Sequence, residues 1–323
     1  MKLIKLSFLF VLLFVFSCKT KSSSEQLHSL ITEHEKERKY DFEEEKTLES
    51  TIKYYEAEAN YAKDLIVKLE NIDTEKLSET DKISHELLVF ILKDKISQHQ
   101  FKTYLNRITS EFAFHLNLSR IANKSLKNDE DVKKYFKELE ELPKHVDLNV
   151  ELLKAGVKEG ISQPKEVFNN YDETYNKHII DDVTKSDFYK PFLKLPESLS
   201  KEKKDSIISA AKVSVQKNAI DQYKKIKTFF QEEYFPNTRK GLGVTTVPNG
   251  KEFYQNRINF YTTSNKYSAK DIHEIGLKEV ARIKAEMEQI IKDLNFKGSF
   301  ADFLQFLRTD EQFYAKTPKE LLM

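Results

Sequence analysis

The sequence predicts a mainly all-α protein, an antiparallel array of helices with one loop rich in proline and glycine and one short β element. Two observations support this prediction. Glycine and proline, the residues that most often end helices, occur only seven times each among 323 residues. Apolar residues recur at helical spacing over most of the chain, as in the stripe from Tyr55 to Leu69. Short polar breaks between such stripes are typical of helices that pack as antiparallel neighbours.

The composition is that of a folded protein without a surplus of either charge. Hydrophobic residues make up 39% of the chain and aromatic residues 12%, which is enough for a substantial core. The 53 basic and 52 acidic residues nearly cancel. Because proteins that bind nucleic acids carry an excess of positive charge, we expect no nucleic-acid partner.

Residues 1–17 resemble a bacterial lipoprotein signal peptide. Lys2 and Lys5 supply positive charge, and the apolar run from Leu6 to Phe16 is too short to span a bilayer comfortably. Cys18 follows at the position where such signals are cleaved, and acylation of this cysteine would anchor the chain to a membrane. We therefore expect a lipid anchor on Cys18.

The segment 18–25 is then a polar tether. An ordinary secretory signal with an incidental cysteine is the alternative, but Cys18 is the only cysteine in the chain, which favours lipidation. Lys19 is not the aspartate that is associated with retention in the inner membrane. We expect a protein of the cell envelope, in the outer membrane rather than the inner membrane.

The region 26–235 is expected to be helical throughout. One helix is predicted over Ile52–Leu69, and Ser78 has the residue type and position of a cap that starts the next one. Asn128 is expected to cap a helix that runs through Leu142, where a proline follows. Ser198 to about Glu233 is expected to form one long and highly charged helix.

The region 236–323 begins with the least helical stretch of the chain. Three of the seven glycines and two of the seven prolines lie between Pro236 and Gly250, which predicts a loop. The following segment, Phe253 to Thr263, is rich in aromatic and β-branched residues. That composition favours a short strand within the β element near 251–263.

This predicted strand gives the best candidate for a binding surface. An edge strand over a cleft can bind an extended peptide through its backbone, with side chains that contact the polar groups of the peptide. The alternative is a strand that packs on helices with its aromatic rings in the core. The candidate residues of the substrate cleft are Tyr254, Arg257, Tyr261, Thr262 and Thr263.

The strongest helix pattern follows this segment. Ser268 and Asp271 have the spacing of a capping box. The apolar residues of one face come next, at helical spacing. They are Ile272, Ile275, Val280, Ile283, Met287, Ile290, Ile291 and Leu294.

Two shorter helices are predicted near the end of the sequence. The first covers Phe300 to Leu307, and the second begins at Thr317-Pro318, where only Lys319–Met323 follow. Since a helix so short is marginal on its own, one expectation is that the protein is longer than this chain. The other is a frayed tail.

No catalytic or metal-binding motif is complete. His85-Glu86 and His273-Glu274 each begin the zinc motif His-Glu-x-x-His, but the fifth positions are Val89 and Leu277, which cannot bind zinc. We therefore expect no catalytic residue, no metal ligand and no cofactor in this chain.

The last ninety or so residues contain a series of short motifs in a specific order and spacing. They are Glu233–Pro236, Arg239, Gly241, Gly243, Pro248–Gly250, Phe253–Tyr254, Tyr261–Thr263, Ile272–Ile283, Glu286–Met287 and Phe303–Asp310. In this order and spacing they resemble the bacterial domain-of-unknown-function 885 family. Weaker similarity extends back to about Ile72.

The resemblance implies a zincin-like, metallopeptidase-type helical fold, in proteins that are often lipoproteins and longer than this chain. The family's metal motif, a His-Glu followed by Pro-Gly-His, has no match here. The resemblance thus implies the N-terminal part of an envelope-anchored, zinc-dependent peptidase, with a peptide substrate and with zinc only in the full-length protein. We expect this part to be inactive alone. The competing interpretation is a non-enzymatic helical surface lipoprotein that acts as a binding or scaffold module.

Overall fold

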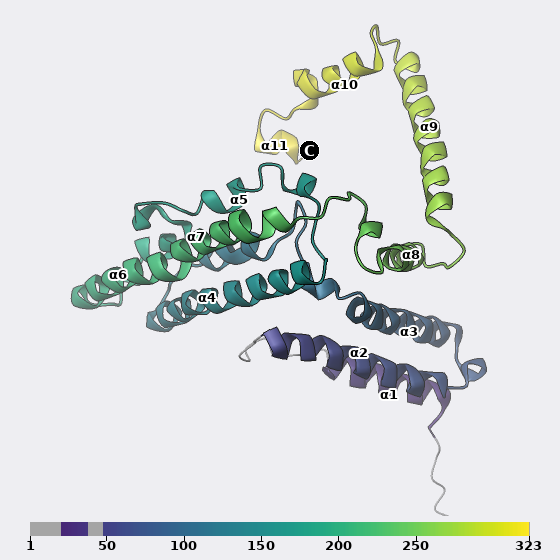
Figure 1. Ribbon diagram of the computed structural model, residues 1–323. Coiled ribbons are helices and arrows are strands. Elements are labelled where there is room, and N and C mark those ends of the chain that lie inside the picture. Colours follow the sequence, from purple (N-terminus) through teal and green to yellow (C-terminus); the bar gives the residue numbers. More distant parts are fainter. Residues whose placement is uncertain (1–20, 38–47, 323) are drawn as a thin grey trace, which may run out of the picture. The chain divides into compact units, whose positions relative to one another are not determined.

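The computed structural model describes residues 21–37 and 48–322. These residues form helices, joined by loops and short 3₁₀ and π-helical turns, and they contain no β-strand (Figure 1). The prediction of a mainly all-α fold is therefore confirmed. None of the described helices combines the length and the apolar character needed to cross a membrane. The predicted signal peptide, 1–17, and Cys18 lie outside the described residues.

The chain forms two compact units, Met1–Pro248 and Asn249–Met323. The division falls within the predicted loop. The helices of the first unit are α1 (Ser23–Glu37), α2 (Leu48–Glu70), α3 (Glu79–Gln100), α4 (Asp129–Lys158), α5 (Glu173–Asn176), α6 (Lys201–Val215) and α7 (Asp221–Thr228).

Helices α1, α2 and α3 pack side by side around a small core of their own (Figure 1). Leu27, Leu65 and Leu92, one from each helix, are fully buried there. The predicted start of α3 is confirmed, because the Ser78 side chain accepts a hydrogen bond from the Asp81 N–H. Spaced apolar residues and a cap are thus sufficient to define this helical layer.

Helix α4 does not stop at Leu142 as predicted. Asn128 caps it as expected, but the helix runs through Pro143 to Lys158. A proline inside a helix removes one backbone hydrogen bond and costs roughly 3 kcal/mol. Leu139 and Val146 lie on the buried face of α4, on either side of Pro143. Both are fully buried, and this burial offsets the cost.

The long helix predicted over Ser198–Glu233 is present as one rod with two π-helical turns. Helix α6 continues through the turn Gln216–Ile220 into α7, and α7 continues through the turn Phe229–Tyr234. The rod packs along α4 (Figure 1). The main core lies beside it and is rich in aromatic side chains. Its fully buried large residues include Tyr135, Tyr175, Phe188, Tyr223, Phe230 and Tyr234.

The second unit consists of α8 (Gly250–Tyr261), α9 (Ala269–Asp293), α10 (Phe300–Thr309) and the short α11 (Pro318–Leu321). Capping boxes at Ser268 and Ser299 start α9 and α10. Beyond the end of α9, Phe296 lies with its ring centroid 5.1 Å from that of Phe303 and 5.3 Å from that of Phe306, both on α10. These half-buried rings pack the start of α10 against the end of α9.

The predicted strand Phe253–Thr263 is wrong, because this segment forms α8. The same residues also fit a helical period, with Tyr254, Arg257 and Tyr261 spaced by three and four positions. A lone strand would leave its backbone N–H and C=O groups unpaired, and the described residues offer no second strand to pair with it. A helix pairs these groups internally. Asn249, with φ 55°, turns the chain into the first turn of α8.

Candidate functional site

Helix α8 carries three of the five predicted cleft residues on one side. Tyr254, Arg257 and Tyr261 are spaced by three and four positions, so that their side chains leave the helix in similar directions. Tyr254 is 41% exposed and Tyr261 is 78% exposed. In a strand, Tyr254 and Arg257 would lie on opposite faces, because successive side chains alternate and the two residues are three positions apart. The helix brings them to the same side.

Arg257 is held close to its own helix. Its Nε donates a hydrogen bond to Oδ1 of Asn256 at 3.0 Å. Its guanidinium carbon lies 4.9 Å from the ring centroid of Phe260 and 5.7 Å from that of Phe253. Stacking on aromatic rings orients a guanidinium. We name Tyr254, Arg257 and Tyr261 the α8 surface.

The other two candidates, Thr262 and Thr263, end the helix. Thr262 Oγ1 donates a hydrogen bond to the Ile258 carbonyl at 2.8 Å. Thr263 has φ 50°, in the left-handed region, and its N–H donates to the Phe260 carbonyl at 3.2 Å. Together with the hydrogen bond from the Ser264 N–H to the Asn259 carbonyl, this is a Schellman motif. These threonines therefore define where α8 stops.

The loop before α8 is fixed by Arg239, whose structural role the sequence did not reveal. Its guanidinium donates to three backbone carbonyls: Gly241 at 3.0 Å, Ser162 at 3.0 Å and Leu242 at 3.1 Å. Its backbone also pairs with Pro164 in an isolated parallel bridge. In the sequence, the only indication of this role is that a single arginine lies in a glycine-rich loop. Its partner Ser162 is 77 positions away in sequence, which no local pattern could indicate.

Tyr234 holds the same region from inside the core. Its hydroxyl accepts a hydrogen bond from the Gln163 N–H and donates one to Oδ1 of Asn106, both at 3.1 Å. Burial raises the pKa of Tyr234 to about 12, so that the hydroxyl stays protonated. Arg239 and Tyr234 therefore form a structural clamp on the loop.

The described residues do not fit the zinc ion that the sequence resemblance implies. They contain no group of three His, Cys, Asp or Glu side chains that could hold a metal ion. Nε2 of His85 lies 3.1 Å from the Leu69 carbonyl, a contact that suits a packing role. His273 lies exposed on α9.

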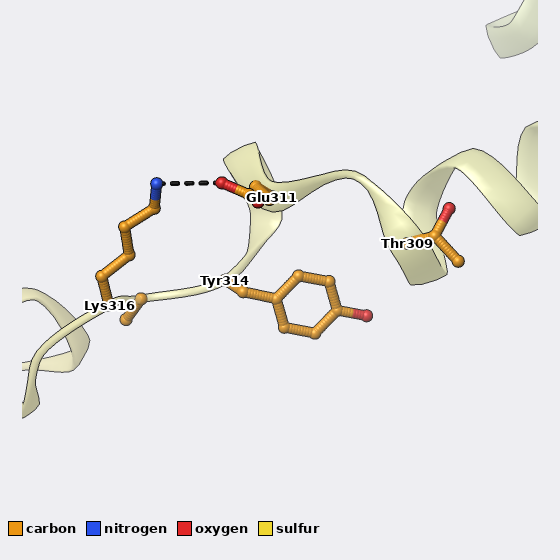
Figure 2. A pocket seen from close by; sticks show the side chains of 5 residues that line it. Thr309, Glu311, Tyr314 and Lys316 are labelled. Carbon is orange, nitrogen blue, oxygen red and sulfur yellow. Dashed lines mark hydrogen bonds and ion pairs between the residues drawn. The ribbon is translucent and has the colours of Figure 1, made fainter.

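A depression in the second unit lies after α10 and has a volume of about 470 Å³. Figure 2 shows its lining, with the Lys316 ammonium joined to the Glu311 carboxylate at 2.9 Å. The ring of Tyr314 lies between that pair and Thr309 (Figure 2). The one carboxylate of the depression is thus already paired, and no second acid or imidazole lines it. The depression offers no acid–base pair for catalysis.

Helix α9 exposes a long apolar stripe. Within its own unit, the helix is covered mainly near its C-terminal end, where Ile291 is 8% exposed. Of the rest of the predicted apolar face, Ile272 is half-buried, and the other six side chains are between 37% and 66% exposed. We name these residues the α9 stripe: Ile275, Val280, Ile283, Met287, Ile290 and Leu294. Contiguous apolar surface of this kind is typical of a face that packs against more protein.

Comparison with known proteins identifies the fold and the family. No curated protein matches the chain significantly. The solved structure of a candidate lipoprotein from Colwellia psychrerythraea is similar, with a TM-score of 0.65 and 17% sequence identity. The match covers 94% of this chain but only 57% of that one, so that this chain spans little more than half the length of that protein. Residues 39–323 match the model of a family described as bacterial protein of unknown function (DUF885). The chain therefore belongs to the DUF885 family.

Proposed function

We propose that this chain is the helical, substrate-facing part of an envelope-anchored DUF885 protein with metallopeptidase-type activity. The observation that carries the proposal is the α9 stripe, an exposed apolar face in a chain that spans 57% of its solved relative. On this proposal the stripe packs against the part of the family fold that this chain does not span. That part would hold the zinc ion, since the described residues offer no ligand group for it.

The α8 surface is the proposed contact for a peptide substrate. Tyrosine and arginine are the residue types that contribute most at binding surfaces, because they combine a large contact area with hydrogen-bonding groups. Arg257 adds a guanidinium that is oriented by stacking on Phe253 and Phe260 of the same helix. Tyr254 and Tyr261 supply exposed rings on the same side of the helix. Thr262 and Thr263 would act by fixing the end of α8.

The proposed anchor is a lipid on Cys18, in the outer membrane. The signal-like pattern of residues 1–17 supports it, as does the solved relative, which is itself described as a candidate lipoprotein. Replacement of Cys18 by alanine should abolish fatty-acid labelling and release the protein from membranes. Retention of both in the variant would exclude the anchor.

Metal content and peptidase activity test the enzymatic part. We expect the full-length Colwellia protein to contain bound zinc and to cleave peptides until a chelator is added. We expect residues 19–323 of this chain alone to show neither property. A stoichiometric zinc ion with chelator-sensitive cleavage in this chain, or a zinc-free and inactive relative, would refute the proposal.

A non-enzymatic binding or scaffold module is the second candidate. It is favoured by the α8 surface, which presents two exposed tyrosines and an oriented arginine, in a chain whose described residues contain no cluster of His, Cys, Asp or Glu that could hold a metal ion. This candidate predicts that the relative binds peptides and never hydrolyses them. The activity measurement therefore separates the two functions.

A further inference from the structure

The core of the first unit contains a group of polar atoms that have no protein partner. The His115 ring is completely buried, and its centroid lies 5.5 Å from that of Tyr171 and 6.2 Å from that of Tyr175. Nδ1 of His115 and the hydroxyls of both tyrosines are buried without a hydrogen-bond partner among the described residues. Three such atoms in one aromatic cluster are unusual, because buried polar groups in native proteins are nearly always paired.

The hydrogen bonds around His115 fix which of its nitrogens carries the proton. The Thr174 hydroxyl donates its hydrogen to the Tyr171 carbonyl at 2.5 Å. It can therefore only accept from Nε2 of His115, which lies 2.9 Å away. The proton is thus on Nε2, and Nδ1 is a bare acceptor that needs a donor.

The surroundings exclude a charged ligand at this place. Phe230, in the π-helical turn after α7, lies 5.6 Å from the His115 ring and stacks at 5.9 Å on Tyr175. Burial lowers the pKa of His115 to about 3, so that the ring is neutral and gives an anion no charge to pair with. No acidic side chain is among the groups that surround His115, and the described residues contain no cluster of three His, Cys, Asp or Glu side chains that could hold a metal ion.

A water molecule matches the unpaired atoms. Nδ1 needs a donor, and each tyrosine hydroxyl needs an acceptor for its proton. Water supplies two donors and two acceptors, and buried waters in proteins typically make about three hydrogen bonds to groups of this kind. We propose that one water molecule is built into this core, where it donates to Nδ1 of His115 and accepts from the hydroxyl of Tyr171 or Tyr175.

The site would lie where three segments of the first unit meet. His115 lies in the 3₁₀ segment Phe114–Ala122, the two tyrosines lie in or next to α5, and Phe230 lies in the π-helical turn. The Tyr223 hydroxyl donates to the His115 carbonyl at 2.9 Å and adds a direct link to α7. The water is thus a structural ligand of the core, independent of the proposed peptidase function.

A high-resolution crystal structure of the full chain tests the position of the water. We expect density within about 3 Å of Nδ1 of His115 and of at least one of the two tyrosine hydroxyls. Absence of density beside Nδ1 would overturn the proposal.

Urea unfolding of Tyr171→Phe and Tyr175→Phe tests its contribution. If a tyrosine donates to the water, its removal leaves the water short of a partner and lowers the urea midpoint. If the hydroxyls are truly unpaired, removing them raises the midpoint. The matched control is Tyr135→Phe in the same core, which loses a hydrogen bond of 2.8 Å to the Phe188 carbonyl and must show a lower midpoint. Midpoints that are raised or unchanged in both test variants contradict the proposal.

Discussion

Tyr234 and Asn106 are joined by a hydrogen bond of 3.1 Å although 128 positions separate them in the sequence. The bond links the end of the long α6–α7 rod to the segment that follows α3, and the same hydroxyl accepts from the Gln163 N–H. The loop that leads to α8 begins only a few residues later. The clamp therefore holds the last loop of the first unit against the core of that unit.

Removal of the Tyr234 hydroxyl should destabilise the first unit. Tyr234→Phe leaves the Gln163 N–H and the Asn106 oxygen without their partner, and each buried group left unpaired costs about 1–3 kcal/mol. Urea unfolding measures the loss. Tyr261→Phe, at an exposed position, is the control and should leave the midpoint unchanged. Equal midpoints for both variants would mean that the clamp contributes nothing to stability.

Loss of the Arg239 guanidinium should loosen the loop without unfolding the chain. Arg239→Gln removes the fork that binds the carbonyls of Ser162, Gly241 and Leu242, and glutamine cannot reach all three. Trypsin cleavage after the exposed Lys240 should therefore become faster. Arg257→Gln on α8 serves as the control. An unaltered cleavage rate in the Arg239 variant would count against the clamp.

Glycine at position 263 should stabilise the end of α8. A β-branched residue in the left-handed region is strained, and glycine at this position of a Schellman motif relieves roughly 1 kcal/mol. Amide hydrogen exchange in α8 should slow in Thr263→Gly. Thr262→Gly should have the opposite effect, since that residue has ordinary helical φ and donates to Ile258. Faster exchange in Thr263→Gly would show that its side chain contributes more than its strain costs.

The stability of the first unit should fall in acid because of His115. Burial lowers the pKa of this imidazole to about 3, whereas it titrates near its ordinary value when unfolded. The neutral imidazole makes its full contribution to the free energy of unfolding above that ordinary value, near 6.5. This contribution is lost as pH falls toward 3, by up to roughly 1.4 kcal/mol per pH unit. Urea midpoints measured between pH 7 and pH 4 should drop less in His115→Gln than in the native chain. The control is the same substitution at the exposed His273. Parallel pH profiles for all three proteins would contradict this assignment.

Two adjacent isoleucines test the exposure of the α9 stripe. Ile291 is 8% exposed and Ile290 is 55% exposed. Ile291→Ala should therefore cost about 2–4 kcal/mol, as in other protein cores, whereas Ile290→Ala should change the unfolding free energy by less than about 1 kcal/mol. Binding of an apolar dye should decrease in the Ile290 variant. Equal destabilisation by the two substitutions would show that the stripe is covered within this chain.

Local signals in the sequence predicted most helices but not the segment at the candidate site. Ser78, Asn128 and Ser268 are correct helix starts, because capping depends on residues within one turn. Phe253–Thr263 has the composition of a strand and the spacing of a helix. The described residues contain no strand that could pair with this segment, and a single segment cannot reveal that absence.

The candidate site was predicted as a set of residues and not as a geometry. Tyr254, Arg257 and Tyr261 do share a surface, but a helix brings them together. The clamp could not be predicted, because Tyr234 and Arg239 find their partners in segments more than 70 positions away. Contacts of this kind follow from packing of the whole unit rather than from any local pattern.

The proposed function requires that the α9 stripe packs against the part of the DUF885 fold that this chain does not span. Thiol modification of an Ile283→Cys variant tests this packing most directly. Cys18, the only native cysteine, is replaced by serine, so that position 283 carries the only thiol. The same cysteine is placed at the matched position of the full-length Colwellia protein. We predict fast modification in this chain and modification at least tenfold slower in the longer protein. Equally fast modification in both proteins would contradict the account.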